Sequence, residues 1–578
     1  STYSYFVDRL ISDVIRDLQA DGGYTVDQAY SLLYSGGLKI YTTQDPTIQS
    51  VVDTEVNNPA NYSDIETSYS FTYSLSVKHA DGTVTRFTEA NIKKYLNKSK
   101  LEYGTKAEID QVIAEFRAAN VADTDTVLGE SKDITLQPQA SMVVMDQTNG
   151  HVLAVTGGRG EKTTSLSLNR ATNTSRQPGS TFKVLTSFAP ALDVMGMTLG
   201  STYYDEPYTY DGKTFNNWYS SSKYAGYATI RQGIVYSMNI IAVRCLTETV
   251  TPALGYSYAE KFGFNTLISN KVINGKVYSD IGAPLALGGL TQGVTNLQLT
   301  AAYASLANSG TYNEPILYTR IYDSDGMIVL DNVPETHEVV TPETAFLLTS
   351  AMSESLETST LNGLFSSSSP AAKLAAMSAA GKSGTTTSYN DLWFVGYTPY
   401  YTAGIWSGYD DNTTFDKSIS KTFHKTIWKK VMDTINAGKV DIGFAMPSDI
   451  VTAEICTKSG KLATDACKAD GRESIVRTEY FVAGTEPTEP CDIHQSITVC
   501  AVSGELPGLF CTQFHTLSYM KLPAVTTGTT QDSEYAYHPT SRCTTCTLAP
   551  AVTETTPAAG TDATAGTAAA GGTVTPAP

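Results

Sequence analysis

The chain has 578 residues, which predicts about two to four folded units with sizeable cores. Its composition is that of a globular protein, and its formal charge of −18 argues against a nucleic-acid partner or an anionic membrane surface, because both require a basic surface. No run of eighteen apolar residues and no secretion-signal pattern occurs, so the sequence predicts no membrane span within these residues.

The first 59 residues predict two helices around a short strand. Apolar residues recur at helical spacing over residues 4–19, which predicts an amphipathic helix. GGLKIYTTQDPTIQSVV (36–52) predicts a strand and then a second helix, with Asp45 as its cap and Pro46 at its first position.

Residues 60–136 predict a small α/β insert. SFTYSLSVKHADGTVTRFT (70–88) alternates polar and apolar residues on both sides of Asp81-Gly82, which indicates a hairpin. TKAEIDQVIAEFRAANVA (105–122) predicts a helix.

From residue 137 to 445 the pattern predicts one larger α/β (α+β) domain. ASMVVMDQTNGHVLAVTGG (140–158) predicts two apolar strands joined at Asn149-Gly150, and helical segments dominate from about 229 to 310. DLWFVGYTPYYTAGIWSGYD (391–410) predicts a strand pair turning at Thr398-Pro399, with a helix near 423–436 behind it. Strands at both ends with helices between them predict an antiparallel sheet that is completed by its last strands and flanked by helices.

The stretch RQPGSTFKVLTS (176–187) places Lys183 three residues after Ser180. Ser-x-x-Lys alone is a weak signal, because it also begins at Ser220, Ser418 and Ser518, and Ser180 is equally suited to cap a helix. In a first helical turn the two side chains would share a face. The lysine could then serve as base for the serine if burial and neighbouring cations lower its pKa.

Two later motifs offer the further groups that such a serine–lysine pair needs, namely a proton relay and side chains that bind the substrate. Ser237-Met-Asn239 offers a hydroxyl that could relay a proton and an amide that could orient the lysine and a substrate. Lys382-Ser383-Gly384-Thr385-Thr386 begins a predicted strand, where glycine allows close approach of a substrate and the polar side chains could hold an anionic group. The order of the three motifs, rather than any one of them, is specific.

Seven of the eight cysteines lie in the last quarter of the chain, at positions 456, 467, 491, 500, 511, 543 and 546, whereas Cys245 stands alone and is expected to be a buried hydrophobe. Clustering in a loop-rich segment favours disulfides of undetermined pairing and an extracytoplasmic setting. The alternative is zinc binding by Cys543-x-x-Cys546 with His494, His515 or His538, for which no second pair of standard spacing is found. We therefore predict no metal site, no cofactor and no internal repeat.

Four stretches together closely resemble the transpeptidase domain of class A penicillin-binding proteins. They are RATNTSRQPGSTFKVLTSFAPALD (170–193), the Ser237-Met-Asn239 segment, PLALGGLTQGVTNLQLTAAYASLANSG (284–310) and GKSGTTTSYNDLWFVGYTP (381–399). GGLKIYTTQDPTIQ (36–49) resembles the linker before that domain, and TKSGKLATDAC (457–467) with TEYFVAGTEP (478–487) resembles its C-terminal extension. The resemblance covers about four-fifths of the chain and leaves out the 60–136 insert and the tail.

This resemblance implies a D,D-transpeptidase of peptidoglycan synthesis that β-lactams acylate. Ser180 would attack the D-Ala-D-Ala carbonyl of a donor stem peptide, Lys183 would be its base, and Ser237 would pass a proton to the leaving amine. Asn239 would bind the donor backbone, and an acceptor amine would resolve the acyl-enzyme. Lys382, with substrate-binding Ser383, Gly384, Thr385 and Thr386, would hold the terminal carboxylate, and the backbone N–H groups of Ser180 and Thr385 would form the oxyanion hole.

The resemblance also implies a domain order and a location. Residues 1–59 would be the linker that follows a glycosyltransferase domain, whose Glu-Asp signature does not occur here. Residues 137–445 would be the transpeptidase domain, 446–548 a cysteine-rich C-terminal extension, and 549–578 a disordered Ala/Thr/Gly/Pro tail. The protein would act at the outer face of the bacterial cytoplasmic membrane, in the cell wall, held there only through an N-terminal anchor absent from this chain.

Three other functions share some of these motifs. A serine β-lactamase needs a Glu-x-x-Leu-Asn loop, and the nearest string, Glu357-Thr-Ser-Thr-Leu-Asn362, has one residue too many. A D,D-carboxypeptidase hands the acyl group to water and is barely separable from a transpeptidase by sequence. A β-lactam-sensing or wall-binding module would acylate without turnover.

Overall fold

The computed structural model describes residues 2–219, 222–473, 475–524, 530–536 and 538–547. The chain divides into two units, residues 1–495 with 518–537 and residues 496–517 with 538–578. The predicted disordered tail lies outside the described residues, as does Ser220. Among the described residues, no helix combines the length and the apolar character that crossing a lipid bilayer requires.

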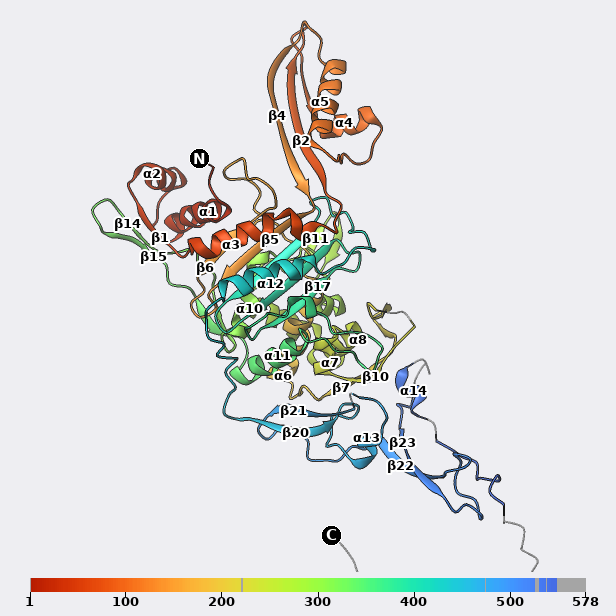
Figure 1. Cartoon of the computed structure of the whole chain (residues 1–578). Helices are drawn as coiled ribbons and strands as arrows, with labels where there is room; N and C mark the ends of the chain where they lie inside the picture. Colours follow the sequence, from red (N-terminus) through yellow and green to blue (C-terminus); the bar gives the residue numbers. More distant parts are fainter. Residues whose placement is uncertain (1, 220–221, 474, 525–529, 537, 548–578) are drawn as a thin grey trace, which may run out of the picture. The chain divides into compact units, whose positions relative to one another are not determined.

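A five-stranded antiparallel sheet lies in the first unit, in the order β17-β18-β19-β5-β6. Figure 1 labels its strands β5, β6 and β17. Its strands are β5 (Gln139–Met145), β6 (Val152–Thr156), β17 (Ala380–Thr385), β18 (Asp391–Tyr397) and β19 (Thr402–Gly408). β5 pairs with β19, with Val143 opposite Gly404, so strands from both ends of the domain share one sheet. The predicted sheet is thus confirmed, and β17 forms one of its edges.

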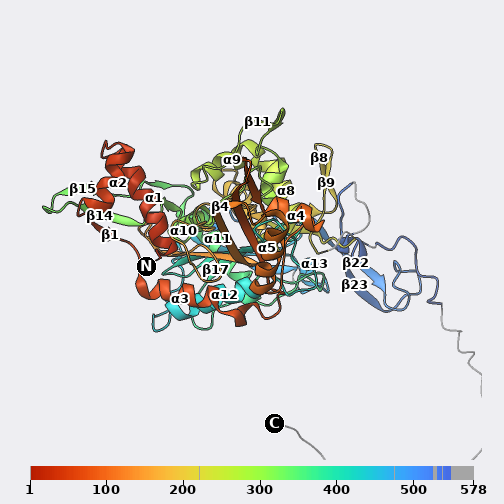
Figure 2. The same cartoon turned by 90° about the horizontal axis from the view of Figure 1, so that it is seen from above.

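Alternate side chains of the sheet enter two different cores. Met142 and Val144 pack with α3 (Pro46–Asn57) and α12 (Phe423–Ile435), whereas Val143 and Met145 belong to the larger core that includes α10 (Asn296–Ala307) and α11 (Pro342–Glu354). Figures 1 and 2 show α3 and α12 together on one face of the sheet. Because both faces are covered, the central strands are continuous apolar runs.

The N-terminal segment contains more structure than its sequence predicts. The predicted amphipathic helix is α1 (Tyr5–Ala20), and the predicted strand is β1 (Lys39–Thr42), but α2 (Val26–Ser35) was not predicted. β1 pairs with β14 (Tyr318–Tyr322), which pairs with β15 (Ile328–Asp331). The cap of α3 is as predicted: Asp45 Oδ1 accepts hydrogen bonds from the N–H groups of Thr47 and Ile48.

The insert has an apolar core of its own. Its sheet has the order β3-β2-β4, formed by β2 (Ser68–Lys78), β3 (Val84–Thr88) and β4 (Thr126–Gln137), with α4 (Glu89–Leu96) and α5 (Lys106–Asn120). The hairpin at Asp81-Gly82 and the helix α5 are as predicted. β4 was not predicted, because most of its residues are exposed and polar.

Short helical segments and hairpins make up a lobe around the Ser180 region. The helical segments are α6 (Ala189–Asp193), α7 (Ile230–Val235), α8 (Asn239–Arg244), η4 (Cys245–Val250), α9 (Pro252–Lys261) and η5 (Ala283–Leu287). The hairpins and strand pairs are β7 (Thr202–Asp205) with β10 (Gly226–Thr229), β8 (Tyr208–Tyr210) with β9 (Lys213–Phe215), β11 (Lys271–Ile273) with β12 (Lys276–Tyr278), and β13 (Thr311–Asn313) with β16 (Thr336–Glu338).

The C-terminal part consists of small elements. β20 (Ile450–Cys456) pairs with β21 (Val476–Val482), and α13 (Asp465–Lys468) lies between them in sequence. β22 (His494–Cys500) and β23 (Phe514–Met520) form a second two-stranded sheet, followed by α14 (Gln531–Glu534). The predicted disulfide framework is wrong in this structure: all eight cysteines are free thiols, because seven of them gather in groups of four ligands rather than in pairs.

Candidate active site

Ser180 lies on a tight turn at the start of an irregular helix. Gly179–Thr181 form a 3-10 turn (η2), Lys183–Phe188 form a π-helical turn (η3), and α-helical geometry begins at Ala189. The sequence predicts a regular helix here, and the structure corrects it to a run of 3-10 and π turns, a departure that is frequent at functional sites. Ser180 is half-buried, and its hydroxyl has no hydrogen-bond partner in the described part of the chain.

Glycines allow the backbone of β17 to pass directly against this turn. Gly179 has a φ of 57°, and a Cβ added to it would lie 2.9 Å from the carbonyl oxygen of Thr385. A Cβ at Gly384 would lie 2.4 Å from the carbonyl oxygen of Pro178. Because real Cβ atoms do not approach backbone so closely, larger residues at either glycine would separate Ser180 from β17.

Ser237 has a strained backbone between two short helices. α7 ends at Val235, α8 begins at Asn239, and Ser237 between them has a φ of 51°. A non-glycine residue in this left-handed region costs about 1–3 kcal/mol, which the surrounding structure must offset. The turn directs both polar side chains of the Ser-Met-Asn motif toward Lys183.

Lys183 is fully buried, and its ammonium group is surrounded by acceptors. Nζ donates to the carbonyl oxygen of Ser237 at 2.6 Å, to Asn239 Oδ1 at 2.7 Å and to Ser237 Oγ at 3.2 Å. Burial lowers the pKa of Lys183 well below its usual value, and the charge of Lys382 lowers it further. A lysine in this environment can hold its amine in the neutral form that a general base requires.

Lys382 approaches the same hydroxyl from the strand side. Its Nζ donates to Ser237 Oγ at 2.8 Å and to the carbonyl oxygen of Ser383 at 2.9 Å. Burial, with the nearby charge of Lys425 as a smaller cause, lowers the pKa of Lys382 to about 7. Ser237 Oγ therefore lies between two buried amines, and a proton can pass between them through it.

Lys425 is a cation near this site that belongs to none of the three sequence motifs. It lies on α12, its pKa is lowered by burial to about 8, and its Nζ donates to the carbonyl oxygen of Ser368 at 2.7 Å. A lysine on an amphipathic helix gives no sequence signal of burial, because only the tertiary contact covers it.

A second set of polar residues holds Asn239. Its Nδ2 donates to the carbonyl oxygen of Asn216 at 2.9 Å, and its backbone N–H donates to Asn217 Oδ1 at 3.0 Å. Asn217 Nδ2 in turn donates to Asp205 Oδ1 at 2.6 Å. Asp205 is fully buried, and burial raises its pKa to about 6. None of these three supporting residues belongs to a motif, so the sequence could not identify them.

The polar residues that follow Lys382 on and after β17 differ in accessibility. Ser383 is buried, whereas Thr385 and Thr386 are half-buried. Thr386 Oγ1 accepts hydrogen bonds from the N–H groups of Asn390 and Asp391, both at 3.1 Å, so it also holds the loop between β17 and β18. The structure brings all the candidate residues to the junction of η2, the α7–α8 turn and the edge strand β17.

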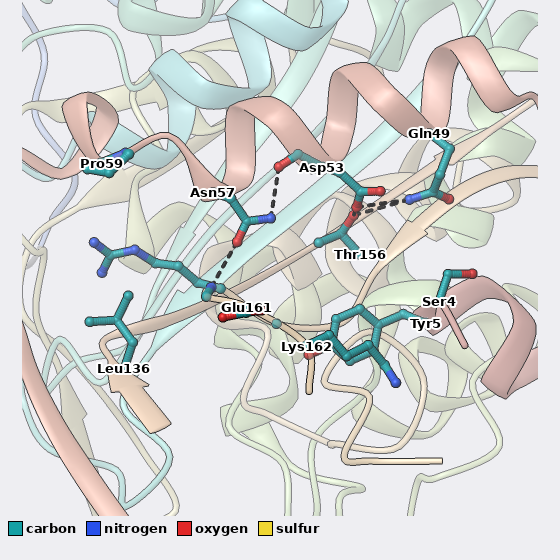
Figure 3. A pocket seen from close by; sticks show the side chains of 13 residues that line it. Ser4, Tyr5, Gln49, Asp53, Asn57, Pro59, Leu136, Thr156, Glu161 and Lys162 are labelled. Carbon is teal, nitrogen blue, oxygen red and sulfur yellow. Dashed lines mark hydrogen bonds between the residues drawn. The ribbon is translucent and has the colours of Figure 1, made fainter. Parts of the chain in front are cut away.

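A pocket of about 410 Å³ lies elsewhere, between α1, α3 and β6 (Figure 3). Figure 3 shows Gln49, Asp53 and Asn57 lining it from α3, with Thr156 on β6. Asp53 has a pKa raised by burial, and Gln49 Nε2 and the Thr156 hydroxyl donate to it at 3.1 and 2.5 Å. The pocket contains none of the Ser180, Ser237 or Lys382 motif residues, and its carboxylate is already satisfied by its neighbours.

A serine beside buried lysines, on a fold of mixed helices and sheets, is typical of domains that transfer acyl groups. Comparison with protein families identifies which family of such domains this is. Residues 140–433 match the penicillin binding protein transpeptidase domain, and residues 446–496 match the penicillin-binding protein 1A C-terminal domain. The chain therefore belongs to the penicillin-binding protein transpeptidase family, with the class A resemblance confirmed.

Curated relatives agree with this assignment. Penicillin-binding protein 1A of Clostridium tetani is 32% identical over 68% of this chain and 50% of its own length. Penicillin-binding protein 1A of Clostridium botulinum (strain Hall) is 29% identical over 89% of this chain and 53% of its own length. The chain thus spans about half the length of the curated relatives it matches.

Solved structures share the fold. Penicillin-binding protein 1A from Haemophilus influenzae matches 84% of this chain and 77% of its own, with a TM-score of 0.56 and 21% identity. The PonA1 protein from Mycobacterium tuberculosis, in complex with penicillin V, matches 76% of this chain and 96% of its own, with a TM-score of 0.52 and 21% identity. These likenesses confirm the predicted transpeptidase fold.

Proposed function

We propose that this chain is the transpeptidase portion of a peptidoglycan D,D-transpeptidase, which cross-links stem peptides through an acyl-serine intermediate and is acylated by β-lactams. The observation that carries the proposal is the convergence of two buried lysines on Ser237 Oγ, at 3.2 Å from Lys183 and 2.8 Å from Lys382. This arrangement gives Ser180, which precedes Lys183 by one turn, both a base and a proton relay.

The first half-reaction forms the acyl-enzyme. Ser180 Oγ attacks the carbonyl carbon between the two D-Ala residues of a donor stem peptide, and its proton passes to the neutral amine of Lys183. The backbone N–H groups of Ser180 and Thr385 stabilise the oxyanion. The C–N bond then breaks, the leaving D-Ala nitrogen receives the proton through Ser237, and the acyl group stays on Ser180.

The second half-reaction returns the serine. An acceptor amine attacks the ester carbonyl, loses a proton along the same relay, and the C–O bond to Ser180 breaks as Ser180 recovers its proton. The new amide is the cross-link. Every step uses side chains and backbone groups of this chain, so the proposal invokes no cofactor.

The donor is held by its ends. Lys382, Ser383, Thr385 and Thr386 bind the terminal carboxylate of the stem peptide or of a β-lactam, and Gly384 lets the substrate backbone approach β17. Asn239, held by Asn216 and Asn217, binds the donor's peptide backbone through its amide. Such substrates lie outside the cytoplasmic membrane, so we propose that the protein works there, in the cell wall.

A fluorescent penicillin tests the nucleophile. We expect a stable covalent adduct, seen by gel fluorescence and intact mass, on the unaltered chain and none on S180A. S418A is the matched control, because Ser418 begins another Ser-x-x-Lys pattern on an exposed loop, where its hydroxyl donates to Asp416. A folded wild type without an adduct would leave only the wall-binding module.

A donor peptide ending in D-Ala-D-Ala, offered with and without an acceptor amine, separates transpeptidase from D,D-carboxypeptidase. We expect D-Ala release with formation of the amide product in the presence of amine. Release with only the free acid, at any amine concentration, would assign the carboxypeptidase instead. Rapid hydrolysis of the penicillin adduct would indicate a β-lactamase.

A further inference from the structure

The seven C-terminal cysteines and His494 form two groups of four metal-type ligands. Cys456, Cys467, Cys491 and His494 make one group, and Cys500, Cys511, Cys543 and Cys546 make the other. Within each group the ligand atoms all lie within 4.8 Å of one another. A tetrahedral zinc ion with bonds of about 2.3 Å to sulfur separates its sulfur ligands by roughly 3.8 Å, so both groups have the dimensions of a zinc site.

In the first group the histidine is oriented as a metal ligand. His494 Nδ1 lies 3.3 Å from Cys456 Sγ and 3.7 Å from Cys491 Sγ. Its other nitrogen, Nε2, lies 3.0 Å from Asp470 Oδ2, and Arg472 holds that carboxylate through Nε at 2.9 Å. A carboxylate behind a ligating histidine fixes the tautomer and the ring orientation that a metal requires.

Backbone N–H groups point at the sulfurs of both groups. Lys458 N donates to Cys456 Sγ and His494 N donates to Cys491 Sγ, both at 3.4 Å. In the second group Val502 N donates to Cys500 Sγ at 3.4 Å and Gly508 N donates to Cys511 Sγ at 3.2 Å. Such donors stabilise thiolates, the form in which cysteine binds a metal.

The two groups are copies of one module. Cys-x-x-Ser-Gly-x-Leu-x-x-x-x-Cys occurs at 456–467 and again at 500–511, and each copy follows a seven-residue strand, β20 or β22. In both copies the glycine has a positive φ, 71° at Gly460 and 73° at Gly504. The prediction of no internal repeat is therefore wrong.

Matching backbone bonds extend the repeat to the last two ligands. Cys456 N donates to Lys461 O, and Cys500 N donates to Glu505 O, both at 2.8 Å. Cys491 N donates to Leu462 O, and Cys543 N donates to Leu506 O, also at 2.8 Å. The modules differ at the fourth ligand, where His494 stands in one and Cys546 in the other. That exchange, with unequal spacing before the third ligand, concealed the repeat in the sequence.

In the part of the chain that the structure describes, neither module has a large apolar cluster of its own. The cluster of buried residues in the first consists of Cys456, Cys467, Cys491 and Ile475. Among the described residues of the second unit, the buried apolar residues other than cysteine are Val499 and Pro539, while Leu509 is 97% exposed. Domains this small need a metal or disulfides to fold.

We propose that each module binds one structural Zn²⁺ ion, the first through three cysteines and a histidine and the second through four cysteines. The three thiols of the first group cannot all form disulfides with one another, because a disulfide takes two thiols, and a disulfide has no use for the buried histidine. In the second, Cys500 Sγ and Cys546 Sγ lie 3.5 Å apart, beyond a disulfide bond of about 2.05 Å. Four protein ligands fill each coordination sphere, so the ions would stabilise structure and not activate water.

Metal content of the purified full chain tests this proposal. We expect two zinc ions per chain by elemental analysis, one in C467S, one in C511S and none in the double variant. C245S, which removes the buried thiol outside both groups, is the matched control and should keep both ions. A wild type without metal, whose thiols are oxidised by intact mass, would overturn the proposal in favour of disulfides.

Conservative exchanges keep the test decisive if the serine variants fail to fold. H494C should give the first module four cysteine ligands, and C546H should give the second three cysteines and a histidine, each variant retaining two ions. After cobalt substitution of the wild type, the absorption spectrum should be the sum of two contributions, one from a site with three sulfur ligands and one nitrogen and one from an all-sulfur site. H494C should lose the mixed-ligand contribution. Iron in place of zinc in the freshly purified protein would overturn the choice of metal.

Discussion

Lys183 and Lys382 are fully buried in the transpeptidase domain, which also has a large apolar core. In the second cysteine module, by contrast, Val499 and Pro539 are the buried apolar residues other than cysteine among those described. The domain has enough apolar burial to offset the desolvation of two amines and the strained turn at Ser237. The described residues of the module bury too little apolar surface to do the same, and the proposed metal stabilises the module instead.

This difference predicts opposite consequences of substitution. In the transpeptidase domain, removing a polar residue of the site should abolish chemistry and leave the fold intact or more stable, since burial of an amine opposes folding. In a cysteine module, removing a ligand should unfold the module, because the ligands are themselves the core.

The largest expected effect is on acylation by penicillin in K183A. Loss of the general base should lower the second-order rate constant of acylation by about 10²–10⁴-fold, whereas the melting temperature should not fall. K417A is the control, because Lys417 is exposed on the loop before α12 and its substitution should leave both quantities unchanged. Near-wild-type acylation in K183A would mean that another group acts as the general base.

The next effect concerns the connection between the first module and the active site. Arg231 on α7 is 2% exposed and forms an ion pair at 2.6 Å with Glu479 on β21, which is fully buried. E479Q leaves Glu354, at 3.0 Å and 32% exposed, as the ion-pair partner of that guanidinium, so the cost should be up to about 3 kcal/mol of unfolding free energy. Since α7 ends two residues before Ser237, acylation should slow as well.

An exposed pair provides the control for that substitution. Glu357 and Lys373 form an ion pair in which both side chains are 55% exposed, so E357Q should cost only about 0–1 kcal/mol. Denaturant unfolding measures both variants. Equal losses would mean that the Arg231–Glu479 pair does not connect the module to the domain.

The sequence predicted most of the transpeptidase fold because its strands are strongly apolar and its motifs are local. Lys183 and Lys382 were selected from patterns that the order of the three motifs made specific. The strained turn at Ser237 and the burial of Lys425 could not be predicted, because each depends on tertiary contacts. The Asn217–Asp205 contact spans twelve residues and belongs to no motif. The same limit affected the cysteine modules, where the four ligands of each group meet only in the folded chain.

Protease sensitivity after metal removal should distinguish the second cysteine module from the transpeptidase domain in one experiment, and this effect is expected to be smaller. Chelation of the full chain by a strong zinc chelator should make the segment 496–517 sensitive to a protease, because its stability depends on the proposed metal. The sheet strand β18, buried on both faces, should stay protected over the same time. Mass spectrometry of the fragments identifies the cleavage sites. Protection of residues 496–517 after complete metal removal would contradict the claim that this module, unlike the transpeptidase domain, depends on a metal for its stability.

The smallest expected effect is a shift in the pH dependence of acylation. Lys382 has a pKa of about 7 in the folded protein, so it carries its charge below that pH and loses it above. Because the charged form binds the carboxylate of a penicillin, the second-order rate constant of acylation should fall as the pH rises through about 7, by up to tenfold per pH unit. Lys183 must be neutral, and its protonation should lower the rate on the acid side, which makes the profile bell-shaped.

K382R separates the two limbs of that profile, because arginine keeps its charge throughout. The alkaline limb should disappear in K382R while the acid limb, which belongs to Lys183, remains.

Removing the Lys382 amine should also change how the unfolding free energy depends on pH. Since Lys382 binds its proton more weakly in the folded than in the unfolded chain, the unfolding free energy of the wild type should rise with pH above about 7. K382M should reduce that slope by the share of one proton and leave the share of the buried Lys183 and Lys425, whose pKa values are also lowered. An unchanged slope would show that Lys382 is not one of the titrating groups.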